Sequence, residues 1–130
     1  MNSFEDLEVW KAARELRKDI SKMAKRFPIE EKFRLKDQII KSSRSAPANI
    51  AEGFGRFHFR ENIQFCRQAR GSINETLEHV ICAFDEGYIA EHMLEGKRKQ
   101  INQCLKLLNG YISYLKKVAI KNKGSKADPQ

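Results

Sequence analysis

Apolar residues recur every three or four positions through four long segments of this chain, and this periodicity constrains the fold more than any other feature. The first segment should become a helix near Phe4, after a capping box made by Ser3 and Asp6. Its apolar stripe continues to Phe27, where the following proline disfavours helical backbone. Its other face mixes lysine with acidic residues, a pattern typical of a solvated surface.

The later segments repeat this amphipathic pattern. Helices are predicted over about residues 30–52, 60–86 and 91–120. Each helix has an apolar face to bury, and short links make consecutive helices antiparallel neighbours. We therefore predict an all-α fold, an antiparallel up-down four-helix bundle. The bundle occupies residues 1–120, and residues 121–130, where the periodicity ends, form a flexible basic tail.

The least generic stretch, Ser42–Arg56, carries serine and alanine where a bundle usually carries leucine, which indicates a close helix crossing. Pro47 lies inside the pattern, lacks a backbone donor and clashes with the preceding turn. We expect the second helix to be kinked or broken near Pro47, with two helices as the alternative. Gly53 and Gly55 are expected to end it by adopting left-handed backbone.

Asn49 and Glu52 are three residues apart and share a helix face. Because no base, nucleophile or metal ligand accompanies them, we interpret them as a hydrogen-bonded pair that fixes helix register, or as a solvated edge. Gly71 costs about 1 kcal/mol relative to alanine in mid-helix, so we expect it to face the small residues of the second helix. Ser72 and Glu75 could then complete a polar cluster with the first pair.

The third helix is expected to end at Gly87 in a Schellman motif. Just before this stop, Val80–Phe84 is apolar at five consecutive positions, which predicts burial on every side and hence self-association. Tyr111, Tyr114 and Val118 widen the apolar stripe of the fourth helix, which also favours self-association. Structural roles are assigned to Trp10, Pro47, Asn49, Glu52, Gly53, Gly55, Gly71, Ser72, Glu75 and Gly87.

The net charge of +8 is unevenly distributed. Residues 71–96 contain six acidic side chains and no lysine or arginine, whereas residues 97–126 contain nine basic side chains and no acidic one. Such blocks are often interaction surfaces for nucleic acid or acidic partners. In an antiparallel hairpin, Glu75 and Glu78 should neutralise part of Lys97–Lys106, so the cations nearer the end of the fourth helix are the better anion sites.

The link between the second and third helices, Gly53–Arg60, alternates aromatic and cationic residues, as single-stranded nucleic acid favours. Alternatively, Phe54, Phe57 and Phe59 plug the bundle end while the arginines stay in water. The candidate nucleic-acid-binding residues are Arg56, Arg60, Lys97, Arg98, Lys99, Lys106, Lys116 and Lys117.

Other classes of function lack support in the sequence. Cys66, Cys82 and Cys104 stand singly, so we expect reduced, mostly buried thiols and neither a metal site nor a disulfide. His79 and His92 are interpreted as ordinary surface or boundary residues. Without a phosphate-binding glycine loop or a nucleophile–base motif, we predict no enzyme and no cofactor. The absence of a bilayer-length apolar run and of a signal peptide predicts a cytoplasmic protein without membrane attachment.

Several short motifs together resemble one known family. They are Asp6–Ala12, Phe33-x-Leu35, Gln38-Ile39, Ser45–Arg56, Ala69–Ser72 and Gly87–Ile89. Similar motifs occur in the four-helix-bundle proteins encoded in intervening sequences of bacterial 23S rRNA genes. The resemblance covers about residues 4–118, and Arg34 and Asn74 depart from the family pattern.

The resemblance implies a four-helix bundle that assembles as a ring, a homopentamer. This family is similar in fold to the accessory variability protein of diversity-generating retroelements, which binds nucleic acid and a reverse transcriptase through a basic barrel. It supplies no catalytic residue. The leading hypothesis is thus an oligomer that binds nucleic acid, RNA rather than DNA, through phosphate contacts without base-specific readout. The alternative is a scaffold whose basic surface docks an acidic protein.

Overall fold

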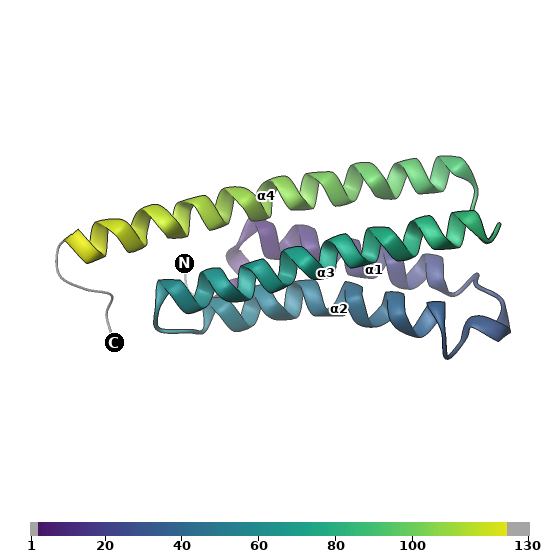
Figure 1. Ribbon diagram of the computed structural model, residues 1–130, viewed down its shortest axis with the longest axis horizontal. Coiled ribbons are helices and arrows are strands. Elements are labelled where there is room, and N and C mark those ends of the chain that lie inside the picture. Colours follow the sequence, from purple (N-terminus) through teal and green to yellow (C-terminus); the bar gives the residue numbers. More distant parts are fainter. Residues whose placement is uncertain (1–2, 125–130) are drawn as a thin grey trace.

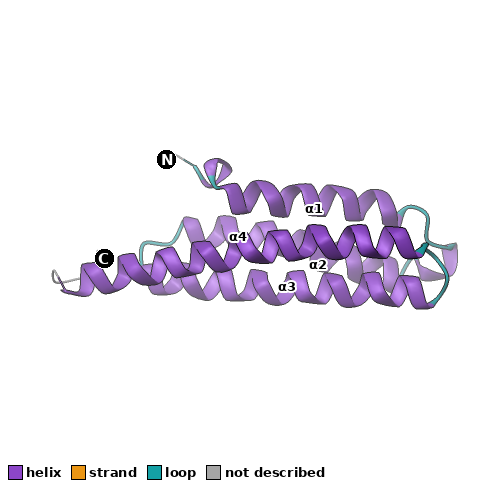
Figure 2. Ribbon diagram, turned by 90° about the horizontal axis from the view of Figure 1, so that it is seen from above, coloured by secondary structure: helices purple, strands orange, loops and turns teal. Residues whose placement is uncertain are grey.

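A computed structural model describes residues 3–124, and these form four long helices packed side by side (Figures 1 and 2). The elements are η1 (Phe4–Asp6), α1 (Glu8–Ala24), η2 (Ile29–Glu31), α2 (Leu35–Phe54), α3 (Phe59–Asp85) and α4 (Glu91–Gly124). No strand occurs within residues 3–124. The prediction of an all-α four-helix fold is confirmed.

Each long helix packs against two others, in the cyclic order α1, α2, α3, α4 and back to α1. Between α2 and α3, Ser42 contacts Thr76 and Ser45 contacts Ser72, so residue numbers rise along one helix as they fall along the other. These two helices are therefore antiparallel. Figure 1 shows the same reversal at the other two connections.

Large aliphatic side chains from all four helices meet in the interior. Those with less than 2% of their surface exposed are Leu16, Ile20, Ile39, Ile50, Ile73, Val80, Ile101 and Leu108. Within Val80–Phe84, Val80 and Ala83 are buried, while the three residues between and after them are half-buried and packed against the same core. One subunit thus already covers much of this apolar segment, so the segment alone does not require a second copy.

The first helix begins later than predicted. The capping box is present, because Ser3 Oγ accepts from Glu5 N–H and the carboxylate of Asp6 accepts from Ser3 N–H, but it caps only the single turn η1. Leu7 then takes extended backbone (φ −72°, ψ 125°), and α1 starts at the next residue. Trp10 is half-buried, and its ring meets Phe4 edge-on at 5.1 Å.

The second helix also begins later, at Leu35 rather than near residue 30. The segment before it forms the 3-10 turn η2, and Glu31 Oε1 accepts from the backbone N–H of Leu35. Since α2 is continuous through the buried Pro47, the alternative of two separate helices is wrong. A kink at Pro47 stays a prediction.

The two glycines near the end of α2 differ from the expectation of left-handed backbone. Gly55 has φ −78°, and among the described residues the only glycine with positive φ is Gly87. Gly53 is instead required by space: a Cβ there would lie 2.7 Å from Asn62 Oδ1 and 2.9 Å from Phe65 Cβ of α3. The close helix crossing predicted for this stretch therefore falls at Gly53.

The turn between α3 and α4 follows the prediction. Gly87 has φ +80°, its N–H donates to Phe84 O, and Tyr88 N–H donates to Ala83 O, which together make the Schellman motif. The fourth helix starts at Glu91 and continues to Gly124, so residues 121–124 are helical rather than part of a tail. Residues 125–130 of the predicted tail lie outside the described residues.

A hydrogen bond from Tyr88 Oη to Glu31 Oε2 at 2.6 Å joins the turn between α3 and α4 to η2. The phenol stabilises the carboxylate and so lowers the pKa of Glu31 below 4.5, and the same bond raises the pKa of Tyr88 to about 12. The contribution of Glu31 to stability is therefore present above pH 4.5 and is lost as pH falls through the folded pKa. The contribution of Tyr88 is present below pH 10 and is lost as pH rises through about 12.

Tyr88→Phe should be less stable than the parent protein at neutral pH, and the difference should vanish once Glu31 is protonated. Urea unfolding midpoints from neutral pH to below pH 4.5 measure this. Tyr114→Phe is the matched control, because the Tyr114 side chain is exposed and no hydrogen bond within the described residues holds its hydroxyl. A Tyr88→Phe deficit that stays constant into acid would contradict the assignment.

Candidate functional site

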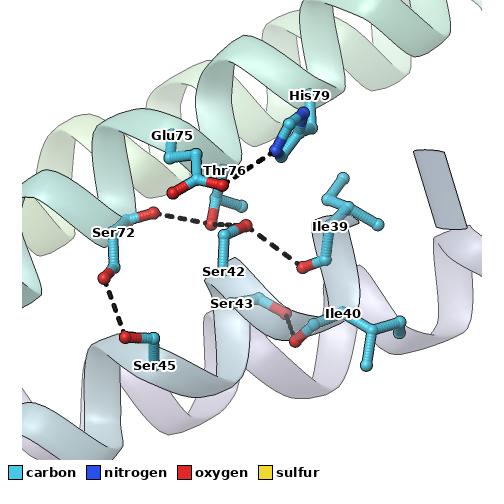
Figure 3. Close-up of polar contacts among 9 residues, drawn as sticks. All are labelled: Ile39, Ile40, Ser42, Ser43, Ser45, Ser72, Glu75, Thr76 and His79. Carbon is cyan, nitrogen blue, oxygen red and sulfur yellow. Dashed lines mark hydrogen bonds and ion pairs between the residues drawn. The ribbon is translucent and has the colours of Figure 1, made fainter. Parts of the chain in front are cut away.

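Hydroxyl groups line the contact between α2 and α3 (Figure 3). Ser42 Oγ lies 2.8 Å from Thr76 Oγ1, which donates to the backbone carbonyl of Ser72 at 2.9 Å. One turn along, Ser72 Oγ donates to Ser45 Oγ at 2.9 Å. Ser42 and Thr76 are buried, and each hydroxyl finds its partner within the fold. These contacts fix the register of the two helices.

The polar cluster predicted at this contact forms only in part. Asn49 Nδ2 donates to both the carbonyl and the hydroxyl of Ser45 at 2.9 Å, so Asn49 and Ser72 meet through Ser45. Glu52 instead pairs with Arg56 at 3.0 Å, and within the described residues no bond joins it to Asn49. Glu75 Oε2 lies 3.1 Å from Nε2 of His79, one turn further along α3.

Gly71 does not face the small residues of α2. It is exposed, and a Cβ built there would meet no atom within 4 Å. The residues of α3 that do approach α2 are its neighbours in the helical pattern, Ser72 and Thr76. The prediction that this mid-helix glycine faces the second helix is therefore wrong.

The sequence-predicted cations lie in differing surroundings. Arg56 pairs with Glu52 and, at 3.9 Å, with Glu61, and its guanidinium lies 4.9 Å from the centre of the Phe65 ring. Arg98 pairs with Glu95 of its own helix at 3.4 Å. Lys97 and Arg98 are half-buried, and the exposed members of the set are Arg56, Arg60, Lys99, Lys106, Lys116 and Lys117.

The predicted neutralisation of the basic block by α3 is not seen. Within the described residues, no ion pair joins Glu75 or Glu78 to a cation of α4. Between these two helices, Arg70 Nη1 of α3 donates a hydrogen bond to the uncharged Asn109 Oδ1 of α4 at 3.0 Å. The acidic residues of α3 and the basic residues of α4 therefore lie on neighbouring helices without forming ion pairs with one another.

A basic hollow of about 270 Å³ lies between α1 and α2, and sequence reasoning missed it. Its lining residues are Arg17, Lys18, Ser21, Lys22, Lys25 and Arg44. No carboxylate lines it; Lys18 has an ion pair, with the exposed Glu15 at 3.4 Å. Two further hollows adjoin it, one sharing Lys22 and the other Lys25.

These three hollows together make what we name the α1 basic surface. Its cations are Arg17, Lys18, Lys22, Lys25, Arg26, Lys32, Lys36, Arg44 and Lys97. The one carboxylate in the lining, Asp19, accepts a hydrogen bond from Gln100 Nε2 at 2.9 Å. The cations that α1 supplies to the first hollow lie within about 140° of the helix circumference, so they share one face of the helix. A count of charges along the chain does not show this shared face. Arg44 joins them only through tertiary packing.

The aromatic link between α2 and α3 fits neither alternative, nucleic-acid contact or plugging of the bundle end, in full. Phe54 and Phe59 are half-buried against the core, as plugging residues would be, whereas Phe57 is 61% exposed. His58 is half-buried and immediately precedes α3, and its carbonyl accepts from Asn62 N–H. The link is thus partly packing and partly free surface.

The thiols are unpaired, and two are buried. Burial raises the pKa of Cys66 and of Cys104 to about 11, which keeps both protonated and unreactive at neutral pH. Cys82 is half-buried. Across the described residues, no cluster of three or more side chains could hold a metal ion. In the same part of the chain, no helix combines the length and the apolar character needed to cross a membrane.

The fold and its surface define a class: a basic, all-helical bundle whose polar residues lock helices together and whose cations gather on the outside. Within that class, the chain belongs to the family of 23S rRNA-intervening sequence proteins, whose family model matches residues 5–110. No curated protein matches it.

A similar solved structure is the crystal structure, at 1.70 Å resolution, of a protein of unknown function from the S23 ribosomal protein family of Bacteroides thetaiotaomicron. The two share 25% sequence identity with a TM-score of 0.75, over 81% of this chain and 95% of that one.

Proposed function

We propose that this protein is a non-enzymatic homo-oligomer that binds RNA through basic surfaces without reading base sequence. The observation that carries the proposal is the α1 basic surface, where nine cations surround three adjoining hollows with one carboxylate among them. Clustered lysine and arginine release condensed counterions when they meet phosphates, and this supplies sequence-independent affinity. The family's link to rRNA intervening sequences favours RNA over DNA as the ligand.

Oligomerisation would strengthen this binding. Ile120 is 72% exposed on α4, which extends past the ends of the other helices (Figure 1). A ring of copies, a pentamer as the family resemblance implies, would cover this residue. Each copy adds a charge of +8, so weak sites would act together through avidity.

The alternative is a scaffold on which the same surface docks an acidic protein. A basic hollow does not by itself distinguish phosphates from carboxylates. The scaffold predicts a stoichiometric protein complex that survives nuclease treatment in a pull-down, whereas the RNA proposal predicts that nuclease releases the bound partner.

Lys22→Glu combined with Lys25→Glu tests the proposal, because each lysine lines two of the three hollows. Affinity for a structured 23S rRNA fragment, measured by gel shift across a salt series, should fall at every salt concentration. The slope of log affinity against log salt should decrease in magnitude by about 1 for each phosphate that the variant no longer neutralises. Lys116→Glu with Lys117→Glu, made in parallel, asks whether the end of α4 contributes.

Lys11→Glu with Lys41→Glu is the matched control, with the same change in net charge. Both lysines are exposed and outside the hollows, and each pairs with an acid of its own helix. The control should retain most of the parent's affinity. Affinity that stays flat between low and physiological salt, or that falls equally in both variants, would reject the α1 basic surface as an RNA site.

A further inference from the structure

We propose that a cavity at the end of the bundle, where α2 passes into α3, holds one unstacked base of a single-stranded RNA. The inference rests on the proposed RNA binding and adds to it a second mode of contact, through the base rather than the phosphate. Such a cavity would distinguish single-stranded from duplex RNA, because the stacked and paired bases of a duplex cannot enter a pocket. The α1 basic surface contacts only phosphates and so cannot make this distinction.

The cavity has a volume of about 410 Å³, within the range typical of small-ligand sites. Leu7, Phe54, Phe59 and Leu115 supply apolar walls from four different parts of the chain. A flat aromatic ring would bury apolar surface there on entering. The helix α4, which supplies Tyr111, Tyr114 and Leu115 to the lining, continues beyond the other helices at this end of the bundle (Figure 1).

Two tyrosines form the stacking surface. Tyr111 and Tyr114 both line the cavity, with ring centroids 6.4 Å apart and planes 15° from parallel. Tyr114 is 59% exposed, so much of its ring is open to a further stacked ring. Stacking of a base on an aromatic side chain contributes about 1–3 kcal/mol and tolerates any base.

A hydrogen-bond donor is set into the same wall. Asn62, which is buried, donates from Nδ2 to Tyr111 Oη at 3.2 Å. The phenol oxygen therefore acts as an acceptor, and within the described residues its own O–H proton has no acceptor. A base carbonyl entering the cavity would accept that proton. Gly53 leaves room for the Asn62 amide, because a Cβ there would lie 2.7 Å from Asn62 Oδ1.

Cations stand at the rim for the phosphates on either side of the base. Arg56 lines the cavity, and the exposed Lys116 and Lys117 directly follow its lining residue Leu115. The pairs of Arg56 with its two glutamates involve half-exposed groups, and exposed ion pairs contribute only about 0–1 kcal/mol. A phosphate can therefore compete for this guanidinium.

The test compares two fluorescent probes of about ten nucleotides, an oligouridylate and an abasic oligomer of the same length and charge. The intact protein should bind the oligouridylate about 5- to 150-fold more tightly than the abasic oligomer. Tyr114→Ala should remove most of this difference and leave abasic binding and its salt slope unchanged. Tyr114→Phe, which keeps the ring, should behave as the parent protein. Leu107→Ala, an exposed apolar residue of α4 outside the cavity, is the control.

Each other result is equally decisive. Equal, salt-dependent binding of both probes would overturn the base site and leave RNA binding through the α1 basic surface intact. Binding of neither probe nor the structured rRNA fragment would remove the proposed function together with the inference. A change in subunit number in Tyr114→Ala, seen by light scattering, would assign the cavity to contact between copies instead. Free uridine monophosphate that binds more tightly than the oligomer would make a mononucleotide the ligand and contradict the RNA site.

Discussion

Gly53→Ala should destabilise the bundle by about 1–3 kcal/mol, although alanine is the better helix former. The added Cβ would lie 2.7 Å from Asn62 Oδ1, 2.9 Å from Phe65 Cβ and 3.1 Å from the Asn62 carbonyl oxygen. Two of these three atoms belong to the backbone or to the first side-chain carbon, so α2 and α3 must move apart. Urea unfolding followed by circular dichroism measures the decrease in stability.

Gly71→Ala is the control, because it makes the same chemical change in a helix where nothing lies within 4 Å. There the substitution should stabilise the protein by about 0.5–1 kcal/mol, since only helix propensity changes. The two variants should therefore shift the free energy of unfolding in opposite directions. If both variants gained stability, the close contact at Gly53 would be contradicted.

Ile73→Ala should cost about 2–5 kcal/mol, the largest effect we expect of any single substitution considered. Ile73 is fully buried on α3, the helix that packs against both α2 and α4. Truncation removes apolar contacts and leaves a cavity that rigid neighbouring helices cannot fill. The unfolding midpoint in urea should fall without a change in slope.

Ile29→Ala makes the same truncation at a residue that is 74% exposed, and it should change stability by no more than about 0.5 kcal/mol. A loss of stability at Ile73 as small as that at Ile29 would mean that the interior can collapse around the missing atoms. Comparing the two variants separates burial from side-chain chemistry.

Local signals in the sequence predicted the fold well. The apolar periodicity identified four helices, and the stop at Gly87 followed from one glycine with an apolar residue beyond it. Helix beginnings were less accurate, because Leu7 and the η2 segment have helical neighbours in sequence and yet adopt other backbone. A periodic pattern cannot report where the first residues leave the helix for a turn.

The candidate site was harder to predict, since it depends on contacts between helices. In the sequence, Ser45 is one small residue among many, yet in the fold it links Asn49 to Ser72. Nothing in the local sequence around Arg44 marks it as a site residue, although it completes a hollow whose other cations come from α1. Counting charge along the chain favoured the end of α4 instead.

The sequence by itself determined that this chain forms four amphipathic helices, that Ser42–Arg56 brings two of them close, and which family the chain belongs to. These follow from the spacing and size of residues, which act over one or two helical turns. Only the tertiary structure decided which side chains face one another: which glycine is needed for space, which hydroxyls pair, and which cations share a hollow. Such contacts depend on the rotation and register of packed helices, and a few degrees of rotation exchange one partner for another.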